Sequence, residues 1–175
     1  AGRFQAAKSQ AFCRSCPAGK HQHAAGATSC LDCGAGNYSG AEAAHCSACG
    51  AGTVPGPART KCIGCEPGYF SNRSTSPCGV CQAGSVTDTL EKSGGSSCTK
   101  CESGRYSATS TSACAGCPVG RFSNSTGLTS GALCTACAAG KYVEGTGSDD
   151  EADCIQCAAG KHQVSEGQGA CVDCD

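Results

Sequence analysis

Cysteine pairs recur along the whole chain at short and nearly constant intervals. All 20 cysteines fall into ten Cys-x-x-Cys pairs, and successive pairs start 16, 17 or 20 residues apart. Self-similarity at one short period indicates an array of a small unit, each copy contacting mainly its neighbours. We therefore expect residues 1–175 to form a single continuous tandem-repeat array. Its units start near Cys13, Cys30, Cys46, Cys62, Cys78, Cys98, Cys114, Cys134, Cys154 and Cys171.

The chain has too few large apolar residues for an ordinary hydrophobic core. Leu, Ile, Val and Phe together number 17 of 175 residues, and Trp and Met are absent. Such a composition is typical of disordered chains, because too little apolar surface can be buried to offset chain entropy. Disulfides replace the core in cysteine-dense secreted modules. We expect the same here, with little or no helix, because no segment shows a 3.6-residue apolar period.

Each repeat also has two fixed positions after its second cysteine. Glycine stands three residues on, which indicates a turn with positive φ or a close backbone approach. Two residues later, at what we call the ring position, comes a ring or a β-branched side chain. This residue predicts the start of a short strand in a two-stranded ribbon. Three units are four residues longer, and we expect their extra residues, such as Ser93-Gly94-Gly95, to form exposed loops.

Local closure predicts a ladder in which the second cysteine of each pair joins the first cysteine of the next. The ladder leaves Cys13 and Cys174 open-ended. Connectivity cannot be deduced from sequence, so other pairings stay possible. The predicted bonds are Cys16–Cys30, Cys33–Cys46, Cys49–Cys62, Cys65–Cys78, Cys81–Cys98, Cys101–Cys114, Cys117–Cys134, Cys137–Cys154 and Cys157–Cys171.

Zinc binding and thiol redox chemistry are the rival interpretations of the cysteine pairs. Two pairs about 13 residues apart could form a Cys₄ zinc site, and such sites would make the chain a metal-storing protein. Redox chemistry needs one poised pair on a βαβ scaffold, which this chain lacks. We favour disulfides, and predict neither a metal nor a cofactor.

The three asparagines all lie in N-glycosylation sequons. These are Asn37-Tyr38-Ser39, Asn72-Arg73-Ser74 and Asn124-Ser125-Thr126. All three follow the repeat glycine closely, where an exposed loop is expected. We therefore predict N-linked glycans at Asn37, Asn72 and Asn124, which requires passage through the secretory pathway.

Other polar residues give weaker signals. A basic residue often follows the repeat glycine, as at Lys20 and Lys161, and nearby acidic residues are expected to offset it. His21 and His23 could bind a metal, but His21 holds the ring position of its repeat, which favours a packing role. The acidic stretch Asp149–Asp153 lacks the order of an EF-hand loop. No catalytic motif is present, and we expect no enzyme activity.

The repeat resembles a known module. The stretch Cys30-Leu31-Asp32-Cys33-Gly34-Ala35-Gly36-Asn37-Tyr38-Ser39 is similar to the ephrin-receptor-like cysteine-rich repeat, which is related in style to the modules of tumour necrosis factor receptors. Such repeats also occur in surface and fibrous proteins of algae and protists, flagellar hairs among them. The resemblance extends over essentially all 175 residues. It implies an elongated rod of β-ribbon units with neighbour-to-neighbour disulfides, and no catalytic or ligand residues.

The two ends of the sequence are in phase with one another. The first residues, Ala1-Gly2-Arg3-Phe4, match Ala139-Gly140-Lys141-Tyr142, and placing Ala1 after Asp175 continues the repeat correctly. The chain is then part of a longer chain or of a filament. Our hypothesis is head-to-tail assembly with Cys174 of one copy bonded to Cys13 of the next, an open contact that generates filaments.

These observations favour a structural extracellular glycoprotein. The expected role is the shaft of a filament, surface coat or appendage such as a flagellar hair, located outside the cell or at its surface. The alternative is a ligand-binding or spacer stalk of a cell-surface receptor. The net charge of −1 does not suggest nucleic acid as a partner. No apolar run approaches the roughly 20 residues of a membrane span, so the expected partners are further repeats and other copies of the chain.

Overall fold

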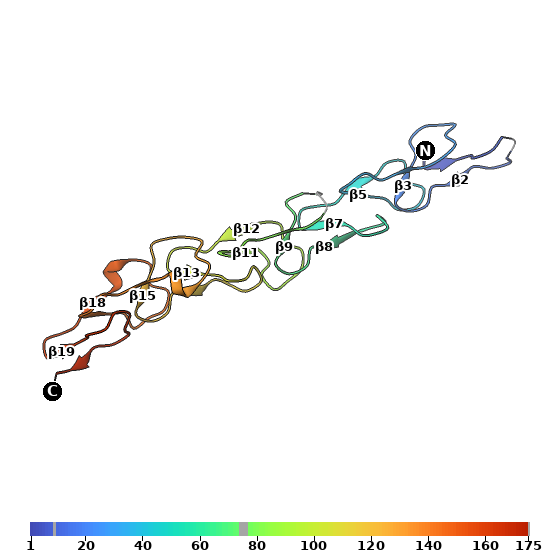
Figure 1. Cartoon of the computed structure of the whole chain (residues 1–175). Helices are drawn as coiled ribbons and strands as arrows, with labels where there is room; N and C mark the ends of the chain where they lie inside the picture. The colour runs from blue at the N-terminus through green and yellow to red at the C-terminus, as the bar shows by residue number, and fades with distance from the viewer. Residues whose placement is uncertain (9, 74–76, 175) are drawn as a thin grey trace. The chain divides into compact units, whose positions relative to one another are not determined.

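The computed structural model describes residues 1–8, 10–73 and 77–174. In these residues the regular structure consists of strands of two or three residues and two short 3-10 helices. The strands pair in chain order into two-stranded antiparallel ribbons (Figure 1). This confirms the predicted fold class of small disulfide-rich repeats with short β-ribbons and mostly irregular structure.

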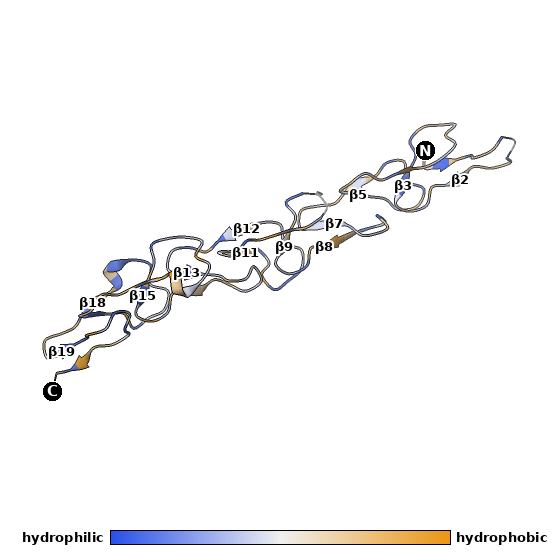
Figure 2. Ribbon diagram, in the orientation of Figure 1, coloured by the Kyte–Doolittle hydropathy of each residue, from blue (hydrophilic) through white to orange (hydrophobic). Residues whose placement is uncertain are grey.

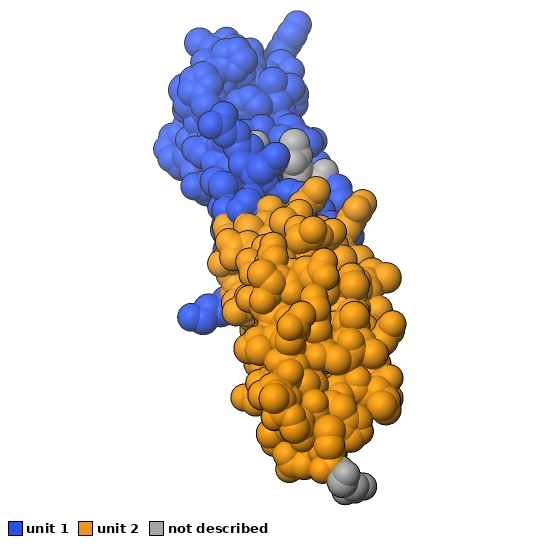
Figure 3. Space-filling model, turned by 90° about the vertical axis from the view of Figure 1, so that its left-hand side faces the viewer, with its two compact units in different colours: residues 1–80, 92–97 blue, residues 81–91, 98–175 orange. Residues whose placement is uncertain are grey.

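Two compact units divide the chain, and Figure 3 colours them separately. Unit 1 comprises Ala1–Val80 and Lys92–Ser97, and unit 2 comprises Cys81–Glu91 and Cys98–Asp175. The single continuous array stays a prediction. The strands of unit 1 are β1 (Arg3–Phe4), β2 (Arg14–Ser15), β3 (Lys20–His21), β4 (Leu31–Asp32), β5 (Asn37–Tyr38), β6 (Ser47–Ala48), β7 (Thr53–Pro55), β8 (Cys62–Gly64), β9 (Tyr69–Phe70) and β10 (Gly79–Val80).

Unit 2 has the same plan with two additions. Two of the three longer repeats contain a 3-10 helix, η1 (Gly131–Leu133) or η2 (Glu151–Asp153), each placed just before a cysteine. The strands of unit 2 are β11 (Ser85–Thr87), β12 (Cys98–Lys100), β13 (Arg105–Tyr106), β14 (Ala115–Gly116), β15 (Arg121–Phe122), β16 (Thr135–Ala136), β17 (Lys141–Tyr142), β18 (Ile155–Gln156), β19 (Lys161–His162) and β20 (Val172–Asp173).

Every ribbon uses the same two places in the repeat. Its first strand follows the repeat glycine, and its second lies at the next cysteine pair, as where Tyr106 of β13 faces Ala115 of β14. The ring position is therefore the second residue of the first strand, which begins one residue earlier than predicted, directly after the repeat glycine. It is half-buried at Tyr106 and exposed at His162.

Sulfur replaces hydrocarbon in the interior. The second cysteine of most pairs is fully or nearly fully buried, as at Cys16, Cys33, Cys65, Cys101 and Cys117, with exposures of 0 or 1%. Figure 2 shows hydrophilic and hydrophobic residues interspersed along the ribbon of both units. The interior is thus a series of cross-links and not a continuous apolar core.

The nine disulfides join the same cysteines as the predicted ladder. They are Cys16–Cys30, Cys33–Cys46, Cys49–Cys62, Cys65–Cys78, Cys81–Cys98, Cys101–Cys114, Cys117–Cys134, Cys137–Cys154 and Cys157–Cys171. Cys13 and Cys174 are free and exposed. Sulfur atoms held in these bonds cannot serve as thiolate ligands, and the two free cysteines do not supply the four thiolates of a Cys₄ zinc site.

Repeats contact one another beyond the nearest neighbour, further than the sequence suggests. At Gly104 the amide donates to the Ser123 carbonyl of the next repeat at 2.7 Å. A Cβ at Gly104 would stand closer than 3.0 Å to the Gly147 carbonyl oxygen, which belongs to the repeat after that. Gly147 in turn donates its amide to the Cys117 carbonyl at 2.9 Å. Three successive repeats therefore meet at one point. We call this contact the glycine cradle: a turn glycine such as Gly104 leaves space where a Cβ would stand, and the carbonyl of a loop residue such as Gly147 fills that space.

The cradle recurs in both units. Within unit 1, Gly2 meets Glu42, Gly19 meets Ala58, and Gly52 meets Gly94. Within unit 2, Gly84 meets Gly127, Gly104 meets Gly147, and Gly120 meets Gly167. The cradle explains why the repeat glycine is glycine: each has a positive φ of 70–84°, and its missing Cβ leaves room for a backbone carbonyl.

One predicted exposed loop is instead packed. Gly94, in the extra segment Ser93-Gly94-Gly95, donates its amide to the Cys65 carbonyl at 2.7 Å, and Gly95 accepts from the Ser71 amide at 2.9 Å. Gly95 is buried. The prediction was wrong here because the insertion supplies the backbone that fills the cradle at Gly52.

Candidate functional site

The free cysteines are the first candidate. Sγ of Cys174 lies 3.8 Å from Nδ1 of His162, and the Cys174 amide donates to the Gly160 carbonyl at 2.9 Å, as the Cys157 amide does to the Gly140 carbonyl one repeat earlier. Cys13 lines an open groove of about 390 Å³ together with residues that include Phe4, Gly26 and Ala27. Both thiols are accessible to a partner sulfur.

Two cradles in unit 2 are open. At Gly140 and Gly160 no atom lies within 4 Å of the position that a Cβ would occupy, although φ is 80° and 83°. In unit 1 the loop residue Gly26 has the φ of a cradle-filling residue, 72°, and likewise has nothing within 4 Å. These residues thus have the positive φ of the residues that meet at Gly104 and Gly147, without the close backbone neighbour.

Three of the four histidines gather in unit 1. The His21 and His23 rings have centroids 6.3 Å apart, and the His23 and His45 rings 5.8 Å, with interplanar angles of 20° and 15°. Nδ1 of His21 is 3.1 Å from Sγ of Cys46. Ligand atoms of His21, Cys33 and Cys46 lie within 4.8 Å of one another, but the two sulfurs share a disulfide and are not metal ligands.

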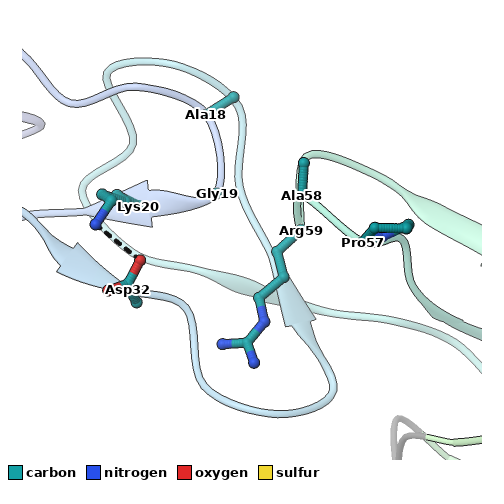
Figure 4. Close-up of a pocket in the computed structure, with 7 residues that line it drawn as sticks. All are labelled: Ala18, Gly19, Lys20, Asp32, Pro57, Ala58 and Arg59. Atoms are coloured by element: carbon teal, nitrogen blue, oxygen red, sulfur yellow. Dashed lines mark ion pairs between the residues drawn. The ribbon is translucent and has the colours of Figure 1, made fainter.

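A groove of unit 1 is lined by charged side chains that interact with other groups of the protein (Figure 4). It has a volume of about 490 Å³ and lies where the loop containing Ala58 packs against the Gly19 turn. Nζ of Lys20 is 2.9 Å from Oδ1 of Asp32, and the guanidinium of Arg59 donates to the Cys33 carbonyl. Lys20 lowers the pKa of Asp32, first by its hydrogen bond and then by its charge, and Arg59 adds a smaller effect.

Basic residues after the repeat glycine are engaged within the protein, as the sequence predicts. Ion pairs join Arg3 to Glu42, Lys20 to Asp32, Lys141 to Glu151 and Lys161 to Asp173, at 3.3, 2.9, 3.5 and 2.8 Å. Asp173 raises the pKa of Lys161, and Lys161 lowers that of Asp173. The hydrogen bond from Ser15, followed by the charge of Arg3, lowers the pKa of Glu42. Two of these pairs, Lys20–Asp32 and Lys161–Asp173, join the two strands of one ribbon, and the other two join a strand to a loop residue or to η2.

The acidic stretch caps a helix. Asp150 accepts a hydrogen bond from the Ala152 amide at 2.8 Å, and Asp153 accepts from the Asp149 and Asp150 amides at 3.1 and 3.4 Å. Asp150 and Asp153 thus form a capping box at η2. Their carboxylates therefore accept hydrogen bonds from nearby backbone amides.

The sequons differ in exposure. Asn124 and Asn72 are exposed, whereas Asn37 is half-buried in β5 and its Nδ2 donates to the Ala35 carbonyl at 3.0 Å. Ser39, the third residue of that sequon, is buried and donates to the Lys20 carbonyl at 2.9 Å. Ser74, the third residue of the Asn72 sequon, lies outside the described residues.

The sequence did not indicate a role for the residue that follows the ring position in each repeat. This residue is buried and usually polar, as at Gln22, Ser39, Ser107 and Ser123, with exposures of 3–6%. Its carbonyl accepts from the glycine amide of the preceding repeat, and its own amide donates onward to the following one, as from Ser107 to Leu128 at 2.9 Å. The small polar residue that recurs at this position was the signal in the sequence that could have indicated this role.

Comparison with known proteins identifies a family of repeats. The family described as "Tyrosine-protein kinase ephrin type A/B receptor-like" matches residues 2–39 and 104–154, together just over half of the chain. A search of curated proteins finds no match. Across the residues that the structure describes, no helix has the length and apolarity needed to cross a membrane. The disulfides and the family together point to an extracellular or cell-surface repeat protein.

Proposed function

Because the chain belongs to the ephrin-receptor-like family of cysteine-rich repeat proteins, we propose that it is a structural glycoprotein that forms the shaft of a filament, surface coat or appendage. In this role the repeats carry mechanical load and no catalysis, and they need no cofactor. Its partners are further repeats and other copies of the chain. A spacer or ligand-binding stalk of a cell-surface receptor is the alternative.

The observation that carries this proposal is the glycine cradle. Each cradle joins three successive repeats through backbone contacts. A bend at one Cys-x-x-Cys pair must therefore also displace a loop that lies two repeats further along the chain. At Gly120 the amide donates to the Val143 carbonyl at 3.0 Å, while the Gly167 amide donates to the Cys137 carbonyl at 2.9 Å. Such overlapping contacts suit a load-bearing element better than a flexible tether.

Head-to-tail assembly is the finer part of the proposal, and the two free, exposed cysteines support it. If Cys174 of one copy bonds to Cys13 of the next, the repeat phase brings the Gly26 loop of the second copy to the Gly160 turn of the first. Both positions have space for backbone contact. The groove that adjoins Cys13 and contains Gly26 is where the incoming turn would lie. Because the contact is heterologous, it repeats without closing.

Two single-cysteine variants test this assembly. Cys13→Ser keeps only the Cys174 thiol, and Cys174→Ser keeps only the Cys13 thiol. Each variant is oxidised under mild conditions alone and in an equimolar mixture, and the products are separated without reductant. We expect disulfide-linked dimers in the mixture and monomers in each variant alone, while the wild type forms a ladder of species that reductant collapses.

Other outcomes contradict the assembly in distinct ways. Dimers of one variant alone would indicate a symmetric contact, and a mass-mapped Cys13–Cys13 or Cys174–Cys174 peptide would identify it. Monomers in all three samples would favour the receptor stalk. In every case the thiol count on denatured, unreduced protein serves as a control, since the ladder leaves two thiols per wild-type chain.

A further inference from the structure

We propose that His21, His23 and His45 form a surface site for a first-row divalent transition-metal ion that prefers imidazole, with Cu²⁺ bound most tightly. The three side chains come from β3, from the residue two positions after it, and from the loop that ends at Cys46. Imidazole nitrogen suits copper, nickel and zinc, and the general affinity order places Cu²⁺ first.

The backbone between these histidines is held in place. Gln22 is 6% exposed, and its Nε2 donates to the Ser29 carbonyl at 2.8 Å while its Oε1 accepts from the Ala24 amide at 2.9 Å. The Gln22 amide donates to the Ala43 carbonyl at 3.1 Å, which ties β3 to the loop that carries His45. Gln22 is thus anchored in the interior between a half-buried His21 and an exposed His23.

A disulfide fixes the third ligand. His45 directly precedes Cys46, which is bonded to Cys33, and Sγ of Cys46 lies 3.1 Å from Nδ1 of His21. The bond therefore holds the loop against β3 at the level of the histidine rings. His21 is half-buried, whereas His23 and His45 are exposed, so a bound ion would retain positions for water.

The ring spacing is close to what a shared ion requires. Imidazole nitrogen binds such ions at about 2.0–2.1 Å, which places the ring centres roughly 5 Å apart around one ion. The centroid separations here are 6.3 and 5.8 Å. The rings are also nearly parallel, at 20° and 15°, so the exposed His23 and His45 side chains must adopt other rotamers before the imidazole nitrogens can converge on one ion.

Copper titration of the intact oxidised protein tests the site. Cys13 and Cys174 are first alkylated, because a free thiol beside His162 is a competing ligand set. Cu²⁺ binding is followed by calorimetry, and the nitrogen ligands are counted from the hyperfine structure in electron paramagnetic resonance. We expect one site with two or three nitrogen ligands. Affinity should fall as the solution is acidified, since protons compete for imidazole.

Histidine variants separate this site from background binding. His23→Ala and His45→Ala should each weaken Cu²⁺ binding by more than about tenfold, because losing even an outer-shell partner of a ligand costs that much. His162→Ala is the matched control: it occupies the same repeat position as His21 but has no histidine neighbour in the described residues, and it should bind as the wild type does. Equal binding by wild type and His45→Ala, or no bound nitrogen, would overturn the proposal.

Discussion

Replacing the repeat glycine by alanine should be costly only where the cradle is filled. Gly104 and Gly140 provide a matched pair within unit 2. Their φ values are 70° and 80°, and both donate their amide to the next repeat at 2.7 Å. A Cβ at Gly104 would meet the Gly147 carbonyl closer than 3.0 Å, whereas a Cβ at Gly140 would meet nothing within 4 Å.

The difference between the two variants isolates the contact. A left-handed conformation costs an L-residue about 1–2 kcal/mol, and reduced freedom of the unfolded chain offsets about 0.4–1 kcal/mol of this. These contributions are common to both sites. Overpacking against Gly147 adds about 1–3 kcal/mol at Gly104, which includes loss of the 2.9 Å hydrogen bond from the Gly147 amide to the Cys117 carbonyl. We therefore expect Gly104→Ala to be the more destabilising variant by about 1–3 kcal/mol.

Native-state hydrogen exchange is the suitable assay, because repeat proteins open locally and a single unfolding free energy is poorly defined. In Gly104→Ala the amide of Gly147 should exchange about 10- to 100-fold faster than in the wild type. In Gly140→Ala that amide should be unaffected, while the Cys157 amide, which donates to Gly140 at 2.9 Å, reports any local strain. Equal effects of the two substitutions would show that positive φ alone selects glycine and would refute the cradle.

Two further predictions concern surface groups. In Lys20→Gln the pKa of Asp32 should rise toward its ordinary value of 3.8, because the hydrogen bond and charge of Lys20 lower it; a carbon-detected NMR titration measures this, and an unchanged pKa would refute the pairing. In the wild type the small stabilisation from this exposed pair is present above pH 3.8 and is lost as the pH falls through the lower folded-state pKa. After secretion from a eukaryotic cell, Asn124 should be glycosylated in a larger fraction of molecules than Asn37, whose sequon is partly buried; peptide mapping after enzymatic deglycosylation gives both occupancies, and equal values would contradict a role for accessibility.

Local features were predictable because each depends on residues close in sequence. The ribbon at Tyr106 follows from the ring position, and the turn at Gly104 from its fixed distance after Cys101. The Cys101–Cys114 bond likewise closes a short loop of sequence separation 13. Here the signal lies in residue type and spacing, which a single sequence displays directly.

The contacts between repeats could not be predicted in the same way. The Gly147 amide reaches the Cys117 carbonyl through the backbone alone, and backbone groups leave no trace in residue type. The histidine cluster was missed for a related reason. His21 and His23 are close in sequence, but the approach of His45 depends on the Cys33–Cys46 bond and on the hydrogen bond from Gln22 to Ala43, and pairing cannot be deduced from sequence.

Backbone contact also explains why the loops vary while the turns do not. The turn glycine must lack a Cβ because a carbonyl occupies that space, but the loop residue that fills the cradle contributes only its backbone. Glu42, which meets Gly2, and Arg59, which directly follows the residue that meets Gly19, have left-handed conformations, with φ of 58° and 52°, in loops where other repeats use glycine. Each has a side chain that returns to the protein: Glu42 pairs with Arg3 at 3.3 Å, and Arg59 donates to the Cys33 carbonyl. The array thus requires glycine on one side of each cradle and accepts substitution on the other, so repeats of unequal loop length can share one packing scheme.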